Sequence, residues 1–465
     1  MQKHEPNNVP FHRQFLASER PHIVMISNHG VHEWRIVPGL PDTGGQVVFV
    51  NEFAKGLAAA GYRVTIVNRG GYQHPQTKEL RRGVIYRGPY QRILCLEDGR
   101  NEFVRKEDMA DQMPALVEDL IDFFGEKMPE IELIISHYWD AAELANRWRQ
   151  ATGSNRLHVW VPHSLGAIKK RNVAPEEWAR LRIDERIEAE REILNQVDAA
   201  ATTSSTIRNS LLDDYEYEGP LPFLPPSVDP DRYRPRAVEP DDPIWSFLAE
   251  RSRLSDEEIR SRQIVTEISR TDTTKRKDIL LRAFANARES MADILLVVSI
   301  DDSNRDLSAE LHAQIDRLEL ADEVIVVGSI WDELPTLYAI TSVYCTPSIM
   351  EGFGMSAQEA AATAVPVIAS PMVPFASEYL LGSDVRQVAS DNGGGALRIG
   401  AGAIVAPADD PAAFGQALRL ILHDADMQRR MGRAAYRITI PDFTWGQRIR
   451  AFLGELSLPV GGSDA

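Results

Sequence analysis

Two glutamates flank a glycine-rich turn, and residues of this kind serve either as helix caps or as contacts for a polyhydroxylated ligand. The run PSIMEGFGMSAQE, which begins where the apolar run VYCTP ends, places Glu351 before the turn and Glu359 after it. Ser356 and Glu359 have the spacing of a capping box, in which the glutamate accepts a hydrogen bond from the serine amide. Glu351 fits no such cap. Because the glycines leave the amides of Met355 and Ser356 open to an anion, the whole motif favours a ligand with both hydroxyl and phosphate groups.

A cationic pair follows the strand-like run QIVTEIS. Arg270 and Lys275 lie in SRTDTTKRKDIL, one at the strand end and the other five residues later. Two long cations at this place suit a diphosphate, whose charge they would neutralise without a metal. The alternative is a solvated basic turn, and we expect that role for the neighbouring Arg276 and Lys277.

Further candidates lie at strand ends in the first half of the chain. PDTGGQ puts Gly44 and Gly45 at the start of a long helical pattern, where a ligand can approach backbone amides, although an ordinary turn has the same composition. The run lacks the G-x-G-x-x-G spacing, which disfavours a nicotinamide cofactor. His163, in VPHSLGAIKKRN, is either a donor in a pocket or a structural histidine. The basic run 169–171 and the pair in VRKED would attract a phosphorylated acceptor or merely coat a helix.

Composition excludes several classes of protein. The chain has 465 residues, which predicts two to four domains, and a formal charge of −17, which disfavours binding to nucleic acid or anionic membranes. Its two cysteines lie in apolar runs, so we expect buried thiols and no zinc site. No apolar stretch is long enough for a membrane span, and the first residues lack the apolar core of a signal peptide. We therefore expect a cytoplasmic location and small-molecule partners.

Short apolar runs alternate with helical patterns twice along the chain, which predicts an α/β fold of two Rossmann-like domains with parallel sheets. The break between them is the proline-rich and charged run LPFLPPSVDPDRYRPRAVEPDDP. Ligands of such domains bind beyond the carboxyl ends of the strands, so the expected site is a deep cleft across which the two sheets face each other. The expected parts are an extension over 1–21, an acceptor-binding domain over 22–225 that a helix at about 443–456 completes, a linker or insertion over 226–262, and a nucleotide-sugar-binding domain over 263–442.

These motifs resemble those of a known family. Two glutamates separated by seven residues around GFGM, with an arginine and a lysine upstream, are similar to the retaining nucleotide-sugar glycosyltransferases of the GT-B fold, and the similarity runs from about residue 22 to 455. The runs DTGGQVVFVNEFAKGLAAAGYRVTIV, SHYWDA, PHSLG, RIEAE and PPSVDPDRY resemble the sucrose-phosphate synthase and mannosylfructose-phosphate synthase branch. PHSLGAIKKR resembles the latter most.

The resemblance implies a role for each candidate. Glu351 would hold the ring hydroxyls of the donor sugar, and Glu359 the ribose hydroxyls. Arg270 and Lys275 would bind the diphosphate and stabilise the charge that develops on the leaving nucleotide. The implied catalytic residues are Glu351, Arg270, Lys275 and His163. The implied donor-binding residues are Glu359, Gly354, Met355, Ser356 and Gly45. The implied acceptor-binding residues are Gly44, Gln46, Lys106, Arg186 and Lys170.

The implied reaction is transfer of a hexosyl group, with retention at the anomeric carbon and with no metal or cofactor. The expected donor is UDP-glucose or GDP-mannose, and the expected acceptor is a small phosphorylated sugar. Alternatives are a transferase that makes a glycerate-type compatible solute or acts on a larger saccharide, and a catalytically silent regulatory protein that binds a nucleotide. One departure from the family concerns the donor phosphates, because VIASPMVPFASEYLLG lacks the usual Gly-Gly-Pro-like turn.

Overall fold

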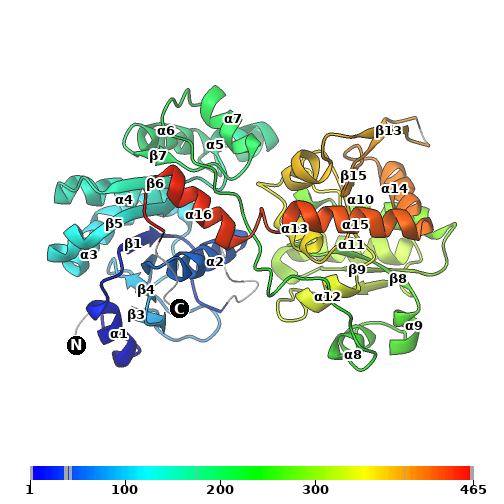
Figure 1. Ribbon diagram of the computed structural model, residues 1–465, viewed down its shortest axis with the longest axis horizontal. Coiled ribbons are helices and arrows are strands. Elements are labelled where there is room, and N and C mark those ends of the chain that lie inside the picture. The colour runs from blue at the N-terminus through cyan, green and yellow to red at the C-terminus, as the bar shows by residue number, and fades with distance from the viewer. Residues whose placement is uncertain (1–3, 36–39, 41–43, 174, 392, 461–465) are drawn as a thin grey trace. The chain divides into compact units, whose positions relative to one another are not determined.

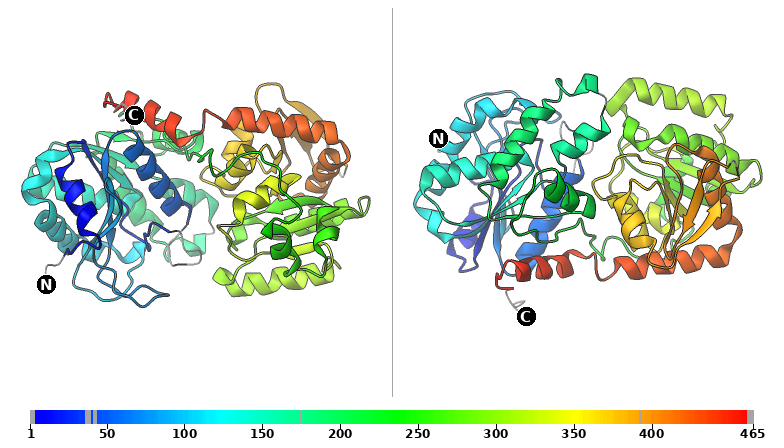
Figure 2. Two further views of the ribbon diagram at one scale, coloured as in Figure 1. Left: turned by 60° about the horizontal axis from the view of Figure 1, so that its bottom comes forward. Right: turned by 90° about the horizontal axis from the view of Figure 1, so that it is seen from above.

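The chain forms two compact units. The computed structural model describes residues 4–35, 40, 44–173, 175–391 and 393–460. Unit 1 comprises Met1–Pro225 together with Trp445–Ala465, and unit 2 comprises Pro226–Thr444. Each unit has its own sheet with helices on both faces, as Figures 1 and 2 show from three sides. The predicted α/β class with two Rossmann-like domains is confirmed.

Unit 1 is built on a seven-stranded sheet in the described residues, with the order β3-β4-β2-β1-β5-β6-β7. Its neighbouring strands are parallel except for the β3–β4 hairpin. The strands are β1 (His22–Ile26), β2 (Arg63–Arg69), β3 (Gly83–Gly88), β4 (Gln91–Leu96), β5 (Ile131–His137), β6 (Leu157–Val161) and β7 (Ala199–Ala200). Successive side chains of β1 enter opposite cores, because strand side chains alternate between faces.

The helices of unit 1 cover both faces of this sheet (Figure 1). They are α1 (Val9–Ala17), α2 (Gly45–Ala59), α3 (Met113–Phe124), α4 (Trp139–Thr152), α5 (Gly166–Asn172), α6 (Ile183–Leu194), α7 (Ser205–Asp213) and α16 (Trp445–Glu455), with short 3₁₀ turns at Lys106–Asp108, Ala110–Gln112, Gly125–Glu130 and Pro175–Glu177. The C-terminal helix α16 packs against α2, where Trp445 stacks on Phe53 with ring centroids 5.8 Å apart. Residues from the far end of the chain therefore complete this core.

Unit 2 has an eight-stranded sheet in the described residues, with the order β10-β9-β8-β11-β12-β15-β14-β13. The strands are β8 (Gln263–Glu267), β9 (Ile294–Val298), β10 (Val324–Val326), β11 (Val343–Thr346), β12 (Val367–Ala369), β13 (Arg386–Ala389), β14 (Ala396–Ile399) and β15 (Ala403–Val405). β14 is antiparallel to both of its neighbours, and the other pairs are parallel. The sequence did not predict β13 and β14, which are short and mostly polar or small.

The helices of unit 2 form layers on both faces of its sheet. They are α8 (Pro243–Ala249), α9 (Asp256–Arg260), α10 (Lys277–Arg288), α11 (Arg305–Arg317), α12 (Leu334–Ile340), α13 (Met355–Ala362), α14 (Pro411–His423) and α15 (Ala425–Thr439), with a π-helical turn at Phe375–Leu380 and 3₁₀ turns at Thr273–Lys275 and Asp302–Asn304. The segment 226–262, expected as a linker or insertion, packs into this unit, because Trp245, Leu248 and Ile259 of α8 and α9 belong to its core.

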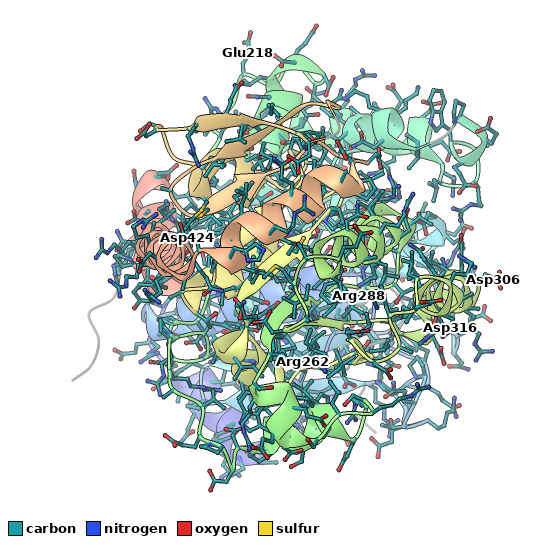
Figure 3. The ribbon with its side chains drawn as sticks, turned by 90° about the vertical axis from the view of Figure 1, so that its right-hand side faces the viewer. Glu218, Arg262, Arg288, Asp306, Asp316 and Asp424 are labelled. Carbon is teal, nitrogen blue, oxygen red and sulfur yellow. The ribbon has the colours of Figure 1, made fainter. Side chains whose placement is uncertain are left out.

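Charged side chains cover the outer surface of unit 2. Figure 3 shows Arg262, Arg288, Asp306, Asp316 and Asp424 around its helices. Asp424 caps α15 by accepting a hydrogen bond from the amide of Met427 at 2.8 Å. Within the described ranges, no helix combines the length and apolarity needed to cross a bilayer.

We expect Phe452→Ala to destabilise unit 1. The Phe452 side chain is fully buried, and its ring meets Phe53 edge-on with centroids 5.7 Å apart. Loss of such a side chain should lower the free energy of unfolding, measured by urea titration, by about 3–5 kcal/mol. Arg450→Ala, on the exposed side of the same helix, should change it by less than about 0.5 kcal/mol. Equal effects of the two variants would show that α16 is not part of this core.

Candidate active site

The turn between β11 and α13 requires glycine at one position. Gly354 is the N-cap of α13 and has φ 103° and ψ 53°, a left-handed conformation that favours glycine. A Cβ atom at this position would lie 2.6 Å from Cγ1 of Val373. Both constraints keep the backbone bare where the helix begins at Met355. The amides at this helix start are therefore not covered by a side chain of residue 354, as an anion site needs.

The structure excludes the capping-box alternative for Ser356 and Glu359. The helix begins at Met355, its N-cap is Gly354, and no side chain among the described residues caps it. Glu359 instead lies one turn into the helix, where its side chain is 9% exposed. A buried carboxylate at the fifth of the eight residues of α13, without a capping role, needs another explanation.

Glu359 has a raised pKa. Burial raises the pKa of its carboxyl to about 7, against the opposite influence of Arg232 and of the hydroxyls of Tyr233 and Tyr338. Those two hydroxyls are buried and complete no hydrogen bond of standard geometry in the described part of the chain. A ligand hydroxyl that donates to the Glu359 carboxylate would stabilise its ionised form against the effect of burial.

The loop after β8 brings a cation to Glu351. Lys275 Nζ donates a hydrogen bond to Glu351 Oε1 at 2.5 Å, and the two side chains are 12% and 20% exposed. Arg270 lies on the same loop, and its exposed guanidinium forms no hydrogen bond or ion pair with any residue that the structure describes. The structure therefore joins two of the predicted catalytic residues directly and leaves the third free to meet an anion.

Lys277 corrects the expectation of a solvated basic turn. Its side chain is 1% exposed and forms an ion pair with the buried Glu267 at 2.6 Å. Arg276 is half-buried and pairs with Asp278 and Asp409. The prediction was wrong because the sequence does not show that Glu267, at the end of a strand, faces the first residue of the following helix.

In unit 1, His163 follows β6 and contacts a second histidine. Its Nε2 lies 3.0 Å from Nδ1 of His137, the last residue of β5, and the edge of Phe49 faces its ring. Burial lowers the pKa of His163 to about 3 and that of His137 well below its usual value. Both rings are therefore neutral near pH 7. His163 can donate or accept one further hydrogen bond but does not supply a positive charge.

The predicted glycines lie at the start of α2. Gly44 is its N-cap, and a Cβ atom there would meet no described atom within 4 Å. Gly45 is the first residue of the helix and is exposed. The side-chain Nε2 of Gln46 donates to the hydroxyl of Ser27 at 3.4 Å. The preceding part of the motif, residues 41–43, lies outside the described residues.

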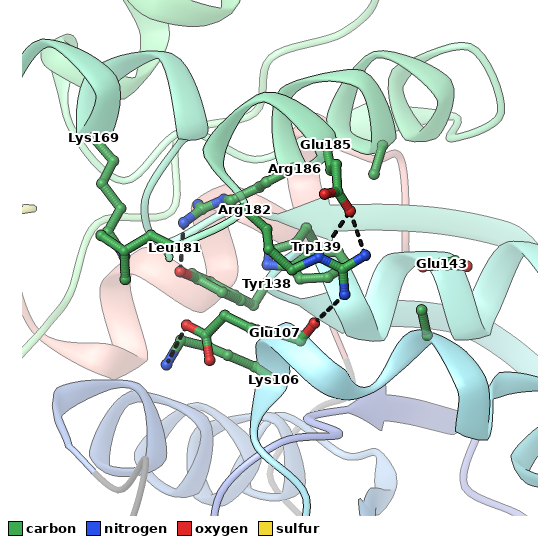
Figure 4. A pocket seen from close by; sticks show the side chains of 12 residues that line it. Lys106, Glu107, Tyr138, Trp139, Glu143, Lys169, Leu181, Arg182, Glu185 and Arg186 are labelled. Atoms are coloured by element: carbon green, nitrogen blue, oxygen red, sulfur yellow. Dashed lines mark hydrogen bonds and ion pairs between the residues drawn. The ribbon is translucent and has the colours of Figure 1, made fainter. Parts of the chain in front are cut away.

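A pocket of about 140 Å³ in unit 1 brings together two predicted acceptor-binding residues, Lys106 and Arg186. Figure 4 shows them on opposite sides of it, with Lys169 and Arg182 nearby and the rings of Tyr138 and Trp139 in its wall. Figure 4 also shows that Arg182 is bound to Glu185 and to the carbonyl of Glu107. The pocket therefore has a cationic lining, part of which is already neutralised by carboxylates.

Arg186 is fixed by a buried network. Its Nε donates to Glu190 at 2.7 Å, its Nη1 donates to the Tyr138 hydroxyl at 2.6 Å, and its Nη2 donates to the Ser164 carbonyl at 2.6 Å. Burial alone would lower the pKa of Arg186, but Tyr138 and Glu190 raise it above the usual value. Its charge is therefore permanent, and its orientation is set before any ligand binds.

Lys169, which the sequence analysis named in the basic run 169–171 but did not select as an acceptor-binding residue, lines the pocket, whereas the selected Lys170 lies outside its lining. Lys170 is instead bound to Asp184 at 2.5 Å and lies over the ring of Trp178. The ammonium of Lys169 forms no hydrogen bond or ion pair with the residues that the structure describes. Burial, followed by the nearby Arg186 and Lys106, lowers the pKa of Lys169.

The described residues offer no cluster of metal ligands and no exposed cysteine. Among the described residues, no group of three or more His, Cys, Asp or Glu side chains is placed to hold a metal ion. Both cysteines, Cys95 and Cys345, are buried free thiols, as expected from their apolar surroundings.

Two family profiles match this chain. The profile for Glycosyl transferases group 1 matches residues 251–438, and that for Glycosyltransferase Family 4 matches residues 43–232. The first match lies within unit 2 and the second almost entirely in unit 1. The chain belongs to the GT-B glycosyltransferases. Membership of this family explains both the fold of two units and the motifs found in the sequence. The GT-B glycosyltransferase family predicted from the sequence is confirmed.

Relatives of this glycosyltransferase support the predicted branch. A mannosylfructose-phosphate synthase from Agrobacterium fabrum is 29% identical over 362 residues, which cover 75% of this chain and 76% of the relative. A D-inositol 3-phosphate glycosyltransferase from Streptomyces avermitilis is 28% identical, with 92% and 86% covered. The structure of sucrose-phosphate synthase from Thermosynechococcus elongatus matches with a TM-score of 0.73 and 23% identity, over 94% of this chain and 98% of that one, which shows the same fold.

We expect Glu359 to make unfolding depend on pH. Because its folded pKa of about 7 exceeds the ordinary value of 4.5, its favourable contribution is complete below about pH 4.5 and is lost as the pH rises through 7. From pH 5.5 to pH 8, the wild type should lose about 2 kcal/mol of unfolding free energy relative to Glu359→Gln. Urea titrations at both pH values measure this difference. The exposed control Glu310→Gln should track the wild type, and a Glu359→Gln variant that does so too would contradict the raised pKa.

Proposed function

We propose that this glycosyltransferase transfers a hexosyl group, with retention of anomeric configuration, from a nucleotide sugar to a small phosphorylated sugar. UDP-glucose and GDP-mannose are the candidate donors. The observation that carries the proposal is the cationic pocket of unit 1, in which Lys169 is unpaired among the described residues and Arg186 is rigidly held. A phosphate group supplies the negative charge that Lys169 lacks, beside an Arg186 that is already paired with Glu190.

Unit 2 supports the donor half of the proposal. Arg270 and Lys275 would bind the diphosphate, with the amides at the start of α13 adding further donors. Glu351, which pairs with Lys275 in the free protein, would then accept hydrogen bonds from the hydroxyls of the transferred sugar. Glu359 would hold the ribose. In the turn after β12, residues 371 and 374 are prolines and have no amide hydrogen to donate to a phosphate. Binding of the diphosphate would therefore depend more on Arg270 and Lys275.

The proposed chemistry needs no nucleophile from the protein. The bond between the anomeric carbon and the β-phosphate oxygen breaks, and the acceptor hydroxyl oxygen bonds to that carbon on the same face. The acceptor proton passes to the leaving phosphate. Arg270 and Lys275 stabilise the negative charge that builds up on this phosphate in the transition state. His163, being neutral, would orient the sugar through a hydrogen bond, and no metal enters the scheme.

The names of the relatives agree with a phosphorylated acceptor. The mannosylfructose-phosphate synthase, the D-inositol 3-phosphate glycosyltransferase and the sucrose-phosphate synthase all have a phosphorylated sugar or inositol in their names. In this chain, the cations of the pocket lining that such a phosphate would face include Lys106, Lys169 and Arg186, which come from three separate segments of unit 1. The aromatic wall of Tyr138 and Trp139 would face the apolar side of a sugar ring.

Release of nucleoside diphosphate tests the reaction. UDP-glucose and GDP-mannose are each incubated in EDTA with and without fructose 6-phosphate. We expect release with one donor, dependent on the acceptor, and at least a hundredfold slower release by Glu351→Gln, about 2.7 kcal/mol. Release that requires an added divalent cation would contradict the metal-free scheme. Near-normal turnover by a folded Glu351→Gln would contradict the assignment of the donor site, and no release with either donor would favour another acceptor or a silent nucleotide-binding protein.

The two adjacent lysines provide a matched pair for the acceptor site. We expect Lys169→Ala to raise the KM for the phosphorylated acceptor about 10- to 100-fold, because a charge-assisted hydrogen bond contributes about 1.5–3 kcal/mol. Lys170→Ala should leave it within about twofold, since exposed ion pairs contribute little. Initial rates at varied acceptor and saturating donor measure both. Equal effects of the two variants would show that the pocket does not bind the phosphate.

A further inference from the structure

A buried ion pair stands at the base of the loop that carries the donor-site cations. Lys277 Nζ donates to Glu267 Oε2 at 2.6 Å, and the two side chains are 1% and 0% exposed. The same ammonium donates to the carbonyl of Ser269 at 3.1 Å and to the hydroxyl of Ser299 at 3.2 Å. All three of its hydrogens therefore have partners, which is the condition for keeping a charged lysine in an interior.

The positions of the pair in the chain give it a geometric effect. Glu267 is the last residue of β8 and Lys277 is the first residue of α10. The segment between them, residues 268–276, contains Arg270 and Lys275. The ion pair therefore ties the two ends of this loop together, directly beneath the cations that it presents.

The rest of the loop is fixed by hydrogen bonds at two further places. Near its start, the Ser269 amide donates to the Ser299 hydroxyl at 2.9 Å, and that hydroxyl donates to the Ser269 carbonyl at 2.6 Å. Near its end, the Ile349 amide donates to the carbonyl of Thr274 at 2.8 Å. This last bond joins the loop to the segment before Glu351, so a shift of the loop base would also disturb the Lys275–Glu351 pair.

Stability alone does not account for a charged pair at this place. Taking two charges out of water is costly, and well-packed apolar residues of similar size are often as stabilising as a buried ion pair or more so. An apolar pair would, however, leave the Ser269 carbonyl without the ammonium and would remove the link from α10 to the loop. The feature that only the ion pair supplies is therefore the fixed position of the loop.

We propose that Glu267 and Lys277 are positioning residues of the donor site, which hold loop 268–276 so that Arg270 and Lys275 meet the diphosphate of the nucleotide. This inference rests on the donor half of the proposed function. A loop held in place before binding saves the cost of ordering two long cationic side chains when the ligand arrives. The benefit concerns the phosphates, because the proposed ribose contact, Glu359, lies on α13 and not on this loop.

The test compares nucleoside diphosphate with nucleoside monophosphate. UDP, UMP, GDP and GMP are titrated by calorimetry, in EDTA, into the wild type, Arg270→Ala and the double variant Glu267→Leu/Lys277→Met. Urea titration confirms that each protein is folded. We expect the double variant to keep the monophosphate affinity of the wild type while its preference for the diphosphate falls at least tenfold. A stable double variant with an unchanged preference would overturn the inference.

One further variant, together with the wild type and Arg270→Ala, keeps the result unambiguous. If the double variant fails to fold, Ser299→Ala removes one partner of Lys277 and both hydrogen bonds to Ser269, and we expect it to lower the diphosphate preference at least threefold. An unchanged preference in that variant would equally overturn the inference. A wild type without any diphosphate preference would overturn the proposed donor site itself. A preference that Arg270→Ala removes and the double variant keeps would overturn the positioning role alone.

Discussion

Parallel strands bring all their carboxyl ends to one edge of a sheet, and the candidate site depends on this constraint. β8 and β11 are neighbours in parallel register, with Val343 opposite Val265. The loops that follow them therefore emerge side by side, which is why Lys275 and Glu351 meet although 76 positions separate them in the chain. In unit 1 the same rule joins His137 and His163, which lie at or beyond the ends of the adjacent strands β5 and β6.

The constraint also explains how far the sequence could lead. Alternating apolar runs and helical patterns were sufficient for the α/β class, and the unusual residues at strand ends were sufficient to select Glu351 and Lys275. Roles that depend on the direction of one side chain could not be predicted from the sequence. The capping-box spacing around Ser356 was compatible with two helix starts. Lys277 and Lys169 are ordinary members of basic runs in the sequence. Only the structure shows that Lys277 is buried and that Lys169 lines a pocket.

Cationic side chains gather at the candidate sites although the net charge of the chain is negative. The chain carries a formal charge of −17, yet cations converge in the pocket of unit 1 and on the loop after β8. Arg182 is already bound to Glu185 and Arg186 to Glu190, which leaves Lys169 as the cation for which an incoming anion is the missing partner among the described residues. An acidic body with such sites would repel bulk polyanions and, under the proposed function, would still accept a small phosphorylated molecule.

If Glu359 holds the ribose as proposed, its pKa near neutrality would couple nucleotide binding to proton exchange with the solvent. With a pKa of about 7, its carboxyl is about half protonated at neutral pH. A ribose hydroxyl that donates to it selects the ionised form, so each binding event would release a fraction of a proton into the buffer. The apparent heat of nucleotide binding would then vary with the ionisation enthalpy of that buffer. The size of this variation would report the number of protons that Glu359 releases.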